Sequence, residues 1–223
     1  MKIFIGYDTR EDIAYEVCKH SIITRQPQAT IYPVVQDQLI DLGLYSRGID
    51  KLASTQFTYT RFLVPKLCDY KGWALFIDCD IILKEDIKKL FDYVDDKYAI
   101  MCVKHNYKPR SNIKMDGQIQ TTYPRKNWSS VMLINCAHDS NKILTPNLIS
   151  DENITGAYLH TFSWLHDNEI GELPVEWNWL VGHYKQPEDG IPKLIHYTEG
   201  GPWFNNFTDC EYSEDWKQEL NGI

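Results

Sequence analysis

Two carboxylates interrupt a hydrophobic stretch in the first half of the chain, and this feature limits the possible folds more than any other. Trp73–Ile77 is a run of five apolar residues, the tripeptide Asp78–Asp80 (Asp-Cys-Asp) follows at once, and Ile81–Leu83 resumes the apolar pattern. A fully apolar run of this length is typical of a strand that is buried on both faces, as in a parallel sheet. Because open α/β sheets bind ligands at the carboxyl ends of their strands, the pattern predicts an α/β protein with two acids at its ligand-binding edge.

Strand and helix patterns alternate in the first hundred residues, which is the order that produces parallel βαβ units. The expected strands cover residues 2–6, 30–35, 73–77, 98–103, 131–135 and 193–197. The expected helices cover residues 9–25, 56–67, 152–164 and 213–220, with a capping box at Thr9–Asp12 and with Pro65 ending or kinking the second helix. We expect one domain over residues 1–223, in which a nucleotide-binding half (about 1–103) merges into a less regular acceptor-binding half (about 104–223).

The charge balance and the N-terminal sequence argue against several classes of protein. Lys and Arg total 23 and Asp and Glu total 31, so the net charge of -8 argues against a surface for nucleic acid or an anionic membrane. No window approaches the ~18 uninterrupted apolar residues of a membrane span. The first apolar run stops before Asp8, short of the about 7–15 residues of a signal peptide. With six cysteines and no C-x-x-C pair, we expect a cytoplasmic protein with reduced thiols.

Asp78 and Asp80 are the leading candidates for chemistry, because two carboxylates one residue apart at a strand end can reach a common hard cation. The D-x-D pattern alone is weak in a chain so rich in acids. Its position inside an apolar stretch adds the information, since a solvated loop has little reason to place two acids there. We therefore expect them to serve a metal ion or a phosphate. The alternative is that they cap the turn after the strand.

His196 is the second candidate, and it lies near the end of the short apolar run Lys193–Tyr197. A histidine in that position is most often structural. Gly200 and Gly201 follow closely, however, and glycines let backbone N–H groups approach a phosphate. The alternative for the glycine pair is a plain turn.

The segment after the first strand, Tyr7–Arg10, lies where the first crevice of such sheets commonly receives a nucleotide. Tyr7, Asp8 and Thr9 are the candidates, and Asp8 is suited to a base or ribose edge. The chain contains neither G-x-G-x-x-G nor G-x-x-x-x-G-K-[ST] at this point, which argues against a dinucleotide site and a P-loop. The alternative is that Asp8 or Thr9 simply caps the helix.

The second half of the chain carries two further signals. Six of the seven tryptophans follow residue 120, and an indole ring suits the face of a sugar. Core packing explains most of them, so only one or two are expected at a site, with Trp164 and Trp203 as the candidates. Residues 104–127 are polar, basic and rich in turn formers, which predicts a functional loop that orders when a ligand binds.

Taken together, five blocks resemble glycosyltransferases of the GT-A fold, most closely family 8, which includes glycogenin and bacterial lipopolysaccharide galactosyl- and glucosyltransferases. The blocks are Ile3–Asp8, Thr58–Leu67, Phe76–Leu83, Ser129–Asn135 and His196–Trp203. They span nearly the whole chain, and their order and spacing are more specific than any single block. The resemblance implies a single GT-A (Rossmann-like) α/β domain with a mixed, mostly parallel central sheet flanked by helices.

The resemblance also implies the ligands: a nucleotide-sugar donor that is UDP-linked, Mn²⁺ (or Mg²⁺), a glycan or other hydroxyl acceptor, and transfer with retention. Arg61 would reach the pyrophosphate or the donor sugar, and Ser129 and Ser130 would border the donor sugar and the acceptor. The complete set of candidates is, for the metal, Asp78, Asp80 and His196; for the nucleotide, Tyr7, Asp8, Thr9, Asp78, Cys79, Gly200 and Gly201; and for the sugars, Arg61, Ser129, Ser130, Trp164 and Trp203.

Two positions depart from the family pattern. The family usually carries a Lys just before Pro-Trp, where this chain has Gly201 in a motif one residue shorter. The family also carries an acidic, Gln-containing stretch that faces the anomeric carbon, where this chain reads Tyr158–Thr161. Within this stretch, His160 is the candidate for a catalytic group. The other catalytic candidates are Arg61 and Asp80.

Other functions share part of these features. A sugar nucleotidyltransferase would share the sheet and the carboxylates, but the Gly-rich basic loop that it usually has is missing from Tyr7–Glu11. Phosphoryl transfer by an aspartyl nucleophile usually wants Thr or Val two residues beyond the second acid, where this chain has Ile82. A non-catalytic protein that binds nucleotide-sugar or carbohydrate stays an alternative.

Because two aspartates repel a diphosphate, donor binding should depend on a divalent cation between the aspartates and the diphosphate.

Overall fold

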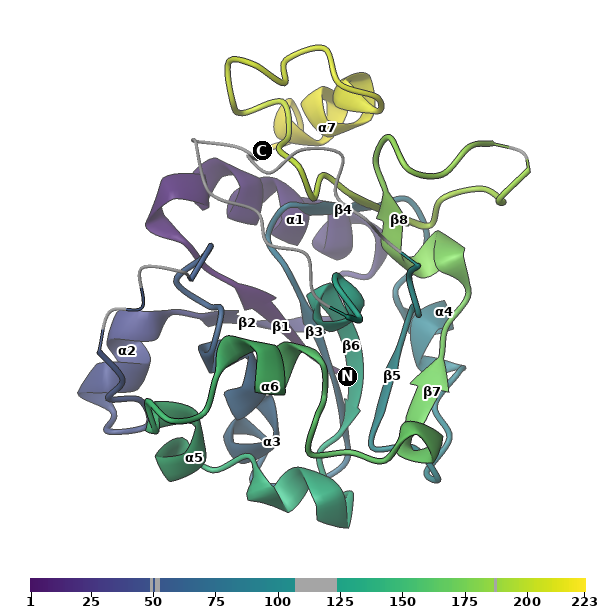
Figure 1. Cartoon of the computed structure of the whole chain (residues 1–223). Coiled ribbons are helices and arrows are strands. Elements are labelled where there is room, and N and C mark those ends of the chain that lie inside the picture. The colour runs from purple at the N-terminus through teal and green to yellow at the C-terminus, as the bar shows by residue number, and fades with distance from the viewer. Residues whose placement is uncertain (49, 51–52, 107–123, 187) are drawn as a thin grey trace.

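The computed structural model of the protein describes residues 1–48, 50, 53–106, 124–186 and 188–223, and a mixed six-stranded sheet forms its centre (Figure 1). The strand order is β2-β1-β3-β6-β5-β7. The strands are β1 (Lys2–Gly6), β2 (Thr30–Val34), β3 (Trp73–Ile77), β5 (Ile100–Cys102), β6 (Val131–Asn135) and β7 (Ile170–Glu172). β1 runs parallel to β2 and β3, and β5 runs parallel to β7, whereas β6 is antiparallel to β3 and β5. The expected mixed, mostly parallel sheet is therefore confirmed.

A second sheet of three short strands continues the chain beyond the carboxyl end of β3. It contains β4 (Ile81–Leu83), β9 (Leu194–His196) and β8 (Trp179–Leu180), in the order β4-β9-β8. β9 is antiparallel to β4 and parallel to β8. Only Asp78–Asp80 separates β3 of the large sheet from β4 of the small one, so the acidic tripeptide lies where the two sheets meet.

Helices cover both faces of the large sheet (Figure 1). One face carries α1 (Asp12–Arg25), which contacts β4 and the terminal helix α7 (Ser213–Leu220). The opposite face carries α2 (Gln36–Asp41), α3 (Val64–Leu67), α5 (Pro146–Ser150) and α6 (Gly156–His160). The remaining helical segments are α4 (Lys88–Phe91), η1 (Thr9–Glu11), η2 (Thr60–Leu63), η4 (Trp128–Ser130), η5 (Asp139–Ile143), η6 (Asp167–Glu169) and η7 (Val175–Asn178).

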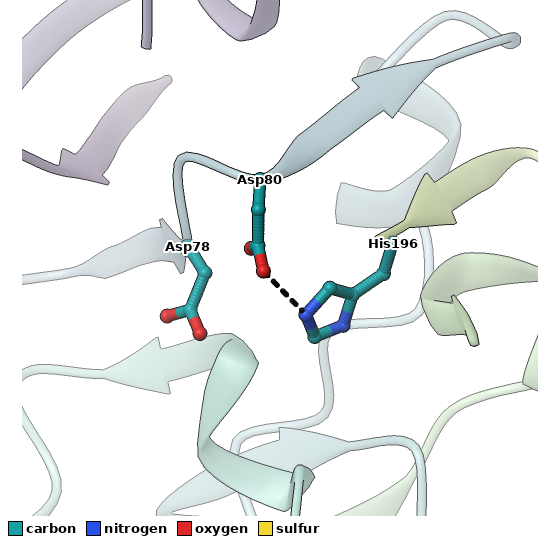
Figure 2. A group of neighbouring side chains, drawn as sticks. All are labelled: Asp78, Asp80 and His196. Atoms are coloured by element: carbon teal, nitrogen blue, oxygen red, sulfur yellow. Dashed lines mark ion pairs between the residues drawn. The ribbon is translucent and has the colours of Figure 1, made fainter. Parts of the chain in front are cut away.

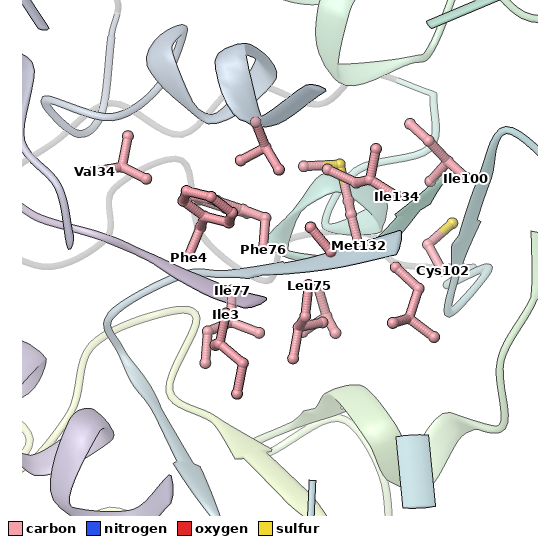
Figure 3. Close-up of a cluster of buried hydrophobic side chains, with 14 of the residues drawn as sticks. Ile3, Phe4, Val34, Leu75, Phe76, Ile77, Ile100, Cys102, Met132 and Ile134 are labelled. Carbon is pink, nitrogen blue, oxygen red and sulfur yellow. The ribbon is translucent and has the colours of Figure 1, made fainter. Parts of the chain in front are cut away.

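The core consists of side chains that alternate between the two faces of the sheet. Figure 3 shows Phe4 and Phe76 on one face and Ile3, Leu75 and Ile77 on the other. This alternation follows from the period of two along a strand. Because helices cover both faces, every residue of β6 is buried and the central strands have continuous apolar sequences.

The central strands, β9 and α7 agree with the sequence prediction, whereas several other short elements do not. β4, β7 and β8 have only two or three residues each and were not predicted. The helix expected over 152–164 is wrong in extent, because α6 covers only Gly156–His160. Within the expected helix 56–67, Pro65 lies in the first turn of α3 and does not end it, since a first-turn proline needs no N–H partner. Residues 107–123 of the expected loop lie outside the described residues.

At the N-terminal cap, the capping box predicted at Thr9–Asp12 is wrong, whereas the alternative that Asp8 caps the helix is confirmed. Asp8, not Thr9, is the N-cap of η1, and its side chain accepts a hydrogen bond from the backbone N–H of Arg10.

The division into two halves with separate binding roles stays a prediction. β6 comes from the second half of the chain and lies between β3 and β5, so the halves share one sheet.

Gly6 allows the close approach that positions the segment before η2. A Cβ atom at Gly6 would lie 2.4 Å from a ring carbon of Phe57, whose carbonyl accepts hydrogen bonds from the backbone N–H (3.2 Å) and Nε (3.3 Å) of Arg61. We predict that Gly6→Ala lowers the free energy of unfolding by about 1–3 kcal/mol, measured by urea denaturation, because overpacking displaces the ring. Gly156→Ala is the matched control, since its Cβ meets nothing closer than 3.4 Å and should cause no loss. Equal denaturation midpoints for Gly6→Ala and the unmodified chain would contradict the prediction.

Candidate active site

Two strand pairings bring the functional residues to the acidic tripeptide. The β3–β6 pairing ends at Ile77 opposite Val131, and the N–H of Asp78 then donates to the carbonyl of Ser130 at 2.9 Å. The β4–β9 pairing begins with Ile81 opposite His196, and the N–H of Tyr197 donates to the carbonyl of Asp80 at 2.9 Å. Backbone register therefore places the serine pair beside the first acid and the histidine beside the second.

Asp78, Asp80 and His196 form one group of potential metal ligands (Figure 2). One ligand atom from each lies within 4.8 Å of the other two, and Nε2 of His196 is 3.3 Å from Oδ2 of Asp80. Asp80 and His196 are almost fully buried. Carboxylate oxygens suit Mg²⁺ and Mn²⁺, and imidazole nitrogen suits the transition metals, so the donor set fits a divalent cation such as Mn²⁺.

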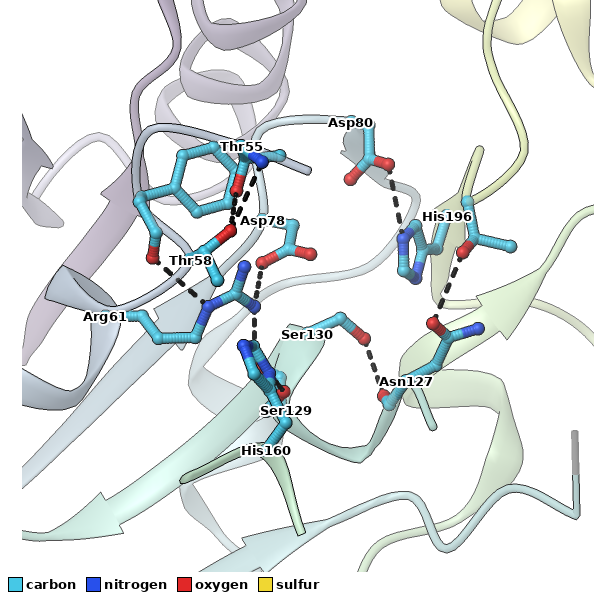
Figure 4. A network of polar contacts seen from close by, with 12 residues as sticks. Thr55, Thr58, Arg61, Asp78, Asp80, Asn127, Ser129, Ser130, His160 and His196 are labelled. Carbon is cyan, nitrogen blue, oxygen red and sulfur yellow. Dashed lines mark hydrogen bonds and ion pairs between the residues drawn. The ribbon is translucent and has the colours of Figure 1, made fainter. Parts of the chain in front are cut away.

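Arg61 is a buried cation on the other side of Asp78. Its Nη1 lies 2.6 Å from Oδ1 of Asp78 and donates to the carbonyl of Ser129 at 3.0 Å (Figure 4). The guanidinium also lies over the rings of Phe57 and Phe76, at 5.0 and 5.1 Å from their centroids. These contacts hold the positive charge in one place, because each reduces the freedom of the long side chain.

His160 is a half-buried, neutral histidine that hydrogen-bonds Ser129. Its Nδ1 lies 2.6 Å from the hydroxyl oxygen of Ser129. Burial lowers the pKa of His160 well below its ordinary value, and the charge of Arg61 lowers it further. The hydrogen bond with the backbone of Thr58 favours the charged form but does not offset these effects. His160 therefore acts on Ser129 as an uncharged imidazole.

These groups line a single cavity of about 420 Å³. Of the predicted site residues it contains Arg61, Asp78, Asp80, Ser129, Ser130, His160 and His196. A cavity of this size holds a drug-sized or nucleotide-sized ligand. The structure thus brings together the predicted metal ligands, the arginine, the serine pair and the histidine.

The predicted nucleotide residues next to β1 lie outside the lining of this cavity. Asp8 is fully buried, and its carboxylate accepts from Nε of Arg10 (3.0 Å), Nη2 of Arg10 (2.7 Å) and the N–H of Gln56 (3.0 Å). Burial alone would raise its pKa, but the hydrogen bonds from Arg10 and Gln56 lower it overall. The hydroxyl of Tyr7 donates to Asp12, and the backbone N–H of Thr9 donates to the side chain of Gln56.

Three other nucleotide candidates also lie outside the lining residues. Cys79 points into the core between the two acids and is buried, which raises the pKa of its thiol. The N–H of Gly200 donates to the carbonyl of Tyr197 at 2.8 Å, so the glycine pair stands in a tight turn. Gly200 has φ +135, and a Cβ at Gly201 would lie 2.0 Å from the ring of Trp203. A turn at these positions therefore requires glycine.

The two tryptophans predicted for the sugars lie in packed aromatic clusters. Trp164 makes edge contacts with Phe62 and Phe162 at centroid distances of 5.7 and 5.6 Å, and its Nε1 donates to Asn141. Trp203 contacts Tyr197 and Trp216 at 5.9 and 5.5 Å. Neither lines the cavity.

Several lining residues were not predicted. They include Glu11, Arg47, Asp50, Tyr59, Lys126, Asn127, Glu152 and Thr198. Glu11 directly follows the Tyr7–Arg10 segment that the sequence analysis singled out, so its position in the chain was a usable signal. Arg47 joins two loops, because its Nη1 donates to the carbonyls of Asp151 and Ile154, both at 2.8 Å. Such a contact between distant loops leaves no trace in the local sequence.

Comparison with known proteins agrees with this fold. The sequence profile described as Glycosyl transferase family 8 matches residues 26–206. The chain is 52% identical over 223 residues to Protein CDI of Arabidopsis thaliana, covering 98% of this chain and 85% of that protein. It is 26% identical over 175 residues to Probable glycosyl transferase Gly of Streptococcus gordonii, covering 73% of this chain and 24% of that protein.

Solved structures of glycosyltransferases share the fold. The bifunctional WbbM in its apo form has a TM-score of 0.69 at 16% identity, over 99% of this chain and 49% of that chain. The galactosyltransferase LgtC, in complex with donor and acceptor sugar analogs, has a TM-score of 0.62 at 12% identity, over 100% of this chain and 96% of that chain. This chain thus spans about half of WbbM and nearly all of LgtC.

The fold and the site define a glycosyltransferase of the GT-A class. Within that class, the profile match over most of the sequence shows that the chain belongs to glycosyl transferase family 8. Among the described residues, no helix is both long enough and apolar enough to cross a membrane.

Two histidines with lowered pKa values, the buried His105 and the half-buried His160, should make the stability of the protein depend on pH. Burial lowers the pKa of His105 from 6.5 to about 3, and the pKa of His160 is also lowered well below 6.5. Both histidines take up a proton more readily in the unfolded chain. Their contribution to the free energy of unfolding is therefore complete above pH 6.5 and is lost as the pH falls below 6.5. We predict that the free energy of unfolding falls between pH 7 and pH 5, by up to about 1.4 kcal/mol per pH unit for each histidine.

Urea denaturation at several pH values measures this slope. The double variant His105→Gln, His160→Gln should have a clearly shallower slope, because glutamine does not titrate. If the double variant kept the slope of the unmodified chain, neutral burial of these two histidines would not be its source.

Proposed function

We propose that the protein transfers a hexose from a UDP-sugar to a hydroxyl group of a glycan or glycoconjugate, with a divalent cation, Mn²⁺ or Mg²⁺, held by Asp78, Asp80 and His196. The convergence of these three side chains on one cavity carries the proposal. When bound there, the cation would act as a Lewis acid that stabilises the negative charge of the leaving nucleotide.

The charges that line the cavity support metal-dependent donor binding. Among the described lining residues, five are carboxylates and three are lysine or arginine, namely Glu11, Asp50, Asp78, Asp80 and Glu152 against Arg47, Arg61 and Lys126. Arg61 already pairs with Asp78, and Arg47 donates to backbone carbonyls. A diphosphate would therefore meet an excess of negative charge, which a divalent cation offsets.

Arg61, Ser129 and His160 have distinct roles in this proposal. Arg61 is fixed beside Asp78 and supplies positive charge on the donor side of the site. Ser129 and Ser130 border the sugars. The uncharged His160 hydrogen-bonds the Ser129 hydroxyl, fixes its orientation and stands as the catalytic candidate for a retaining reaction.

Other assignments stay predictions. Tyr7, Asp8, Thr9, Cys79 and the glycine pair are expected at the nucleotide, and Trp164 and Trp203 at the sugars or acceptor. We further propose a reducing compartment such as the cytoplasm, which fits six free cysteines.

We predict that Asp80→Asn lowers the Mn²⁺-dependent release of UDP from UDP-glucose or UDP-galactose about a hundredfold or more, since losing one ligand removes several kcal/mol of transition-state stabilisation. The measurement is free UDP after incubation with the sugar nucleotide, in Mn²⁺ and in EDTA. Asp37→Asn, at an exposed acid of α2, is the matched control and should keep wild-type turnover.

Three results would reject the proposal in different ways. Wild-type turnover by Asp80→Asn would exclude the metal site. Release of pyrophosphate from a nucleoside triphosphate and a sugar phosphate would point to nucleotidyl transfer. Tight binding of UDP-sugars without any UDP release, with every acceptor tried, would point to a non-catalytic binding protein.

A further inference from the structure

Asn178 is a fully buried amide directly behind the proposed metal site. It is the last residue of η7, immediately before β8, and its side chain has no exposed surface. Its Oδ1 lies 2.9 Å from Nδ1 of His196, and its Nδ2 donates to the hydroxyl of Ser130 at 2.9 Å and to the carbonyl of Asn127 at 3.3 Å. It does not line the cavity, so it can act only through these neighbours.

The neighbours of Asn178 determine which way its amide points. The carbonyl of Asn127 only accepts, so the amide must present Nδ2 to it. The single hydroxyl proton of Ser130 is donated to that same carbonyl at 2.7 Å (Figure 4). The oxygen of Ser130 is therefore left to accept from Nδ2. With Nδ2 used in this way, Oδ1 faces His196.

This orientation determines the tautomer of His196. Because Oδ1 of Asn178 can only accept, Nδ1 of His196 carries the hydrogen. In the neutral ring, the lone pair then lies on Nε2, the nitrogen that faces Asp80 at 3.3 Å. A metal ion needs that lone pair, and a hydrogen bond to the opposite ring nitrogen also fixes the plane of the ring.

We propose that Asn178 is a positioning residue for the metal site. Its amide presents Nε2 of His196 to the cation and links His196 to Ser130. The inference rests on the proposed metal site. The same amide holds a metal ligand and a serine that borders the sugars, so it fixes the distance between the two parts of the cavity.

Binding of Mn²⁺ to the purified protein without any donor tests this inference, with free Mn²⁺ followed by its EPR signal. Asn178→Leu keeps the shape but removes the acceptor, and it should weaken Mn²⁺ binding about 10–100-fold. Asn178→Asp keeps an acceptor for Nδ1 and should retain affinity within about threefold of wild type, because a carboxylate serves the same role. If Asn178→Leu does not fold, Asn178→Ala provides the same loss without the bulk.

Asn141→Leu is the matched control. Asn141 is also fully buried and makes three hydrogen bonds, to the carbonyls of Ala99 and Asn135 and from Trp164. It has no contact with the metal ligands, so its loss should lower stability and leave Mn²⁺ affinity unchanged. A merely structural role for Asn178 would make the two leucine variants alike in Mn²⁺ affinity.

The outcomes separate this inference from the proposed function. Failure of the unmodified protein to bind Mn²⁺ would reject the metal site itself. Wild-type binding by Asn178→Leu, or equal weakening in Asn141→Leu, would leave the metal site in place and overturn the positioning role. Weakening in Asn178→Asp as large as in Asn178→Leu would also overturn it, since the acceptor is then not what matters.

Discussion

Two antiparallel strand pairings end on either side of Asp78–Asp80, and the arrangement of the site depends on their registers. β3 and β6 pair as far as Ile77 and Val131, and β4 and β9 pair from Ile81 and His196. Because side chains alternate with a period of two, a slip of one residue in either pairing would turn its functional side chains into the core. The large sheet thus supplies the first acid and the serine pair, and the small sheet supplies the second acid and the histidine.

Burial makes the polar groups of the site depend on one another. Arg61 and Asp78 pair at 2.6 Å, and His196 lies between Asp80 and Asn178. In surroundings with little water, such contacts are stronger than at the surface, and the loss of one partner is correspondingly costly. The overall charge of -8 and the acidic lining are the reason why we propose that a cation accompanies the anionic donor in the site.

The sequence predicts the central strands and the metal-ligand candidates because burial on both faces leaves a clear signal. Trp73–Ile77 is apolar throughout since helices cover the sheet on both sides, and two acids directly after it stand out. His196 could be found for the same reason, at the end of a buried strand. The resemblance to family 8 added Arg61 and the serine pair, which no local pattern distinguishes.

The rest of the site depends on contacts between distant segments, which single-sequence reasoning cannot see. Asn178 looks like any polar residue beside a short strand, and only the β8–β9 pairing places it behind His196. Asp8 carries the features of both a ligand and a cap, and its contacts with Arg10 and Gln56 become visible only in the fold. The packing of Trp164 is likewise visible only in the fold, because its neighbour Phe62 comes from a distant segment of the chain.

The central claim is that a divalent cation at Asp78, Asp80 and His196 mediates between the protein and a nucleoside diphosphate. Crystals grown with Mn²⁺ and UDP, measured at a wavelength where manganese scatters anomalously, test it most directly. The account predicts one anomalous peak in contact with all three side chains and with the diphosphate. A diphosphate bound to Arg61 and Lys126 without manganese, or manganese bound elsewhere in the cavity, would contradict it.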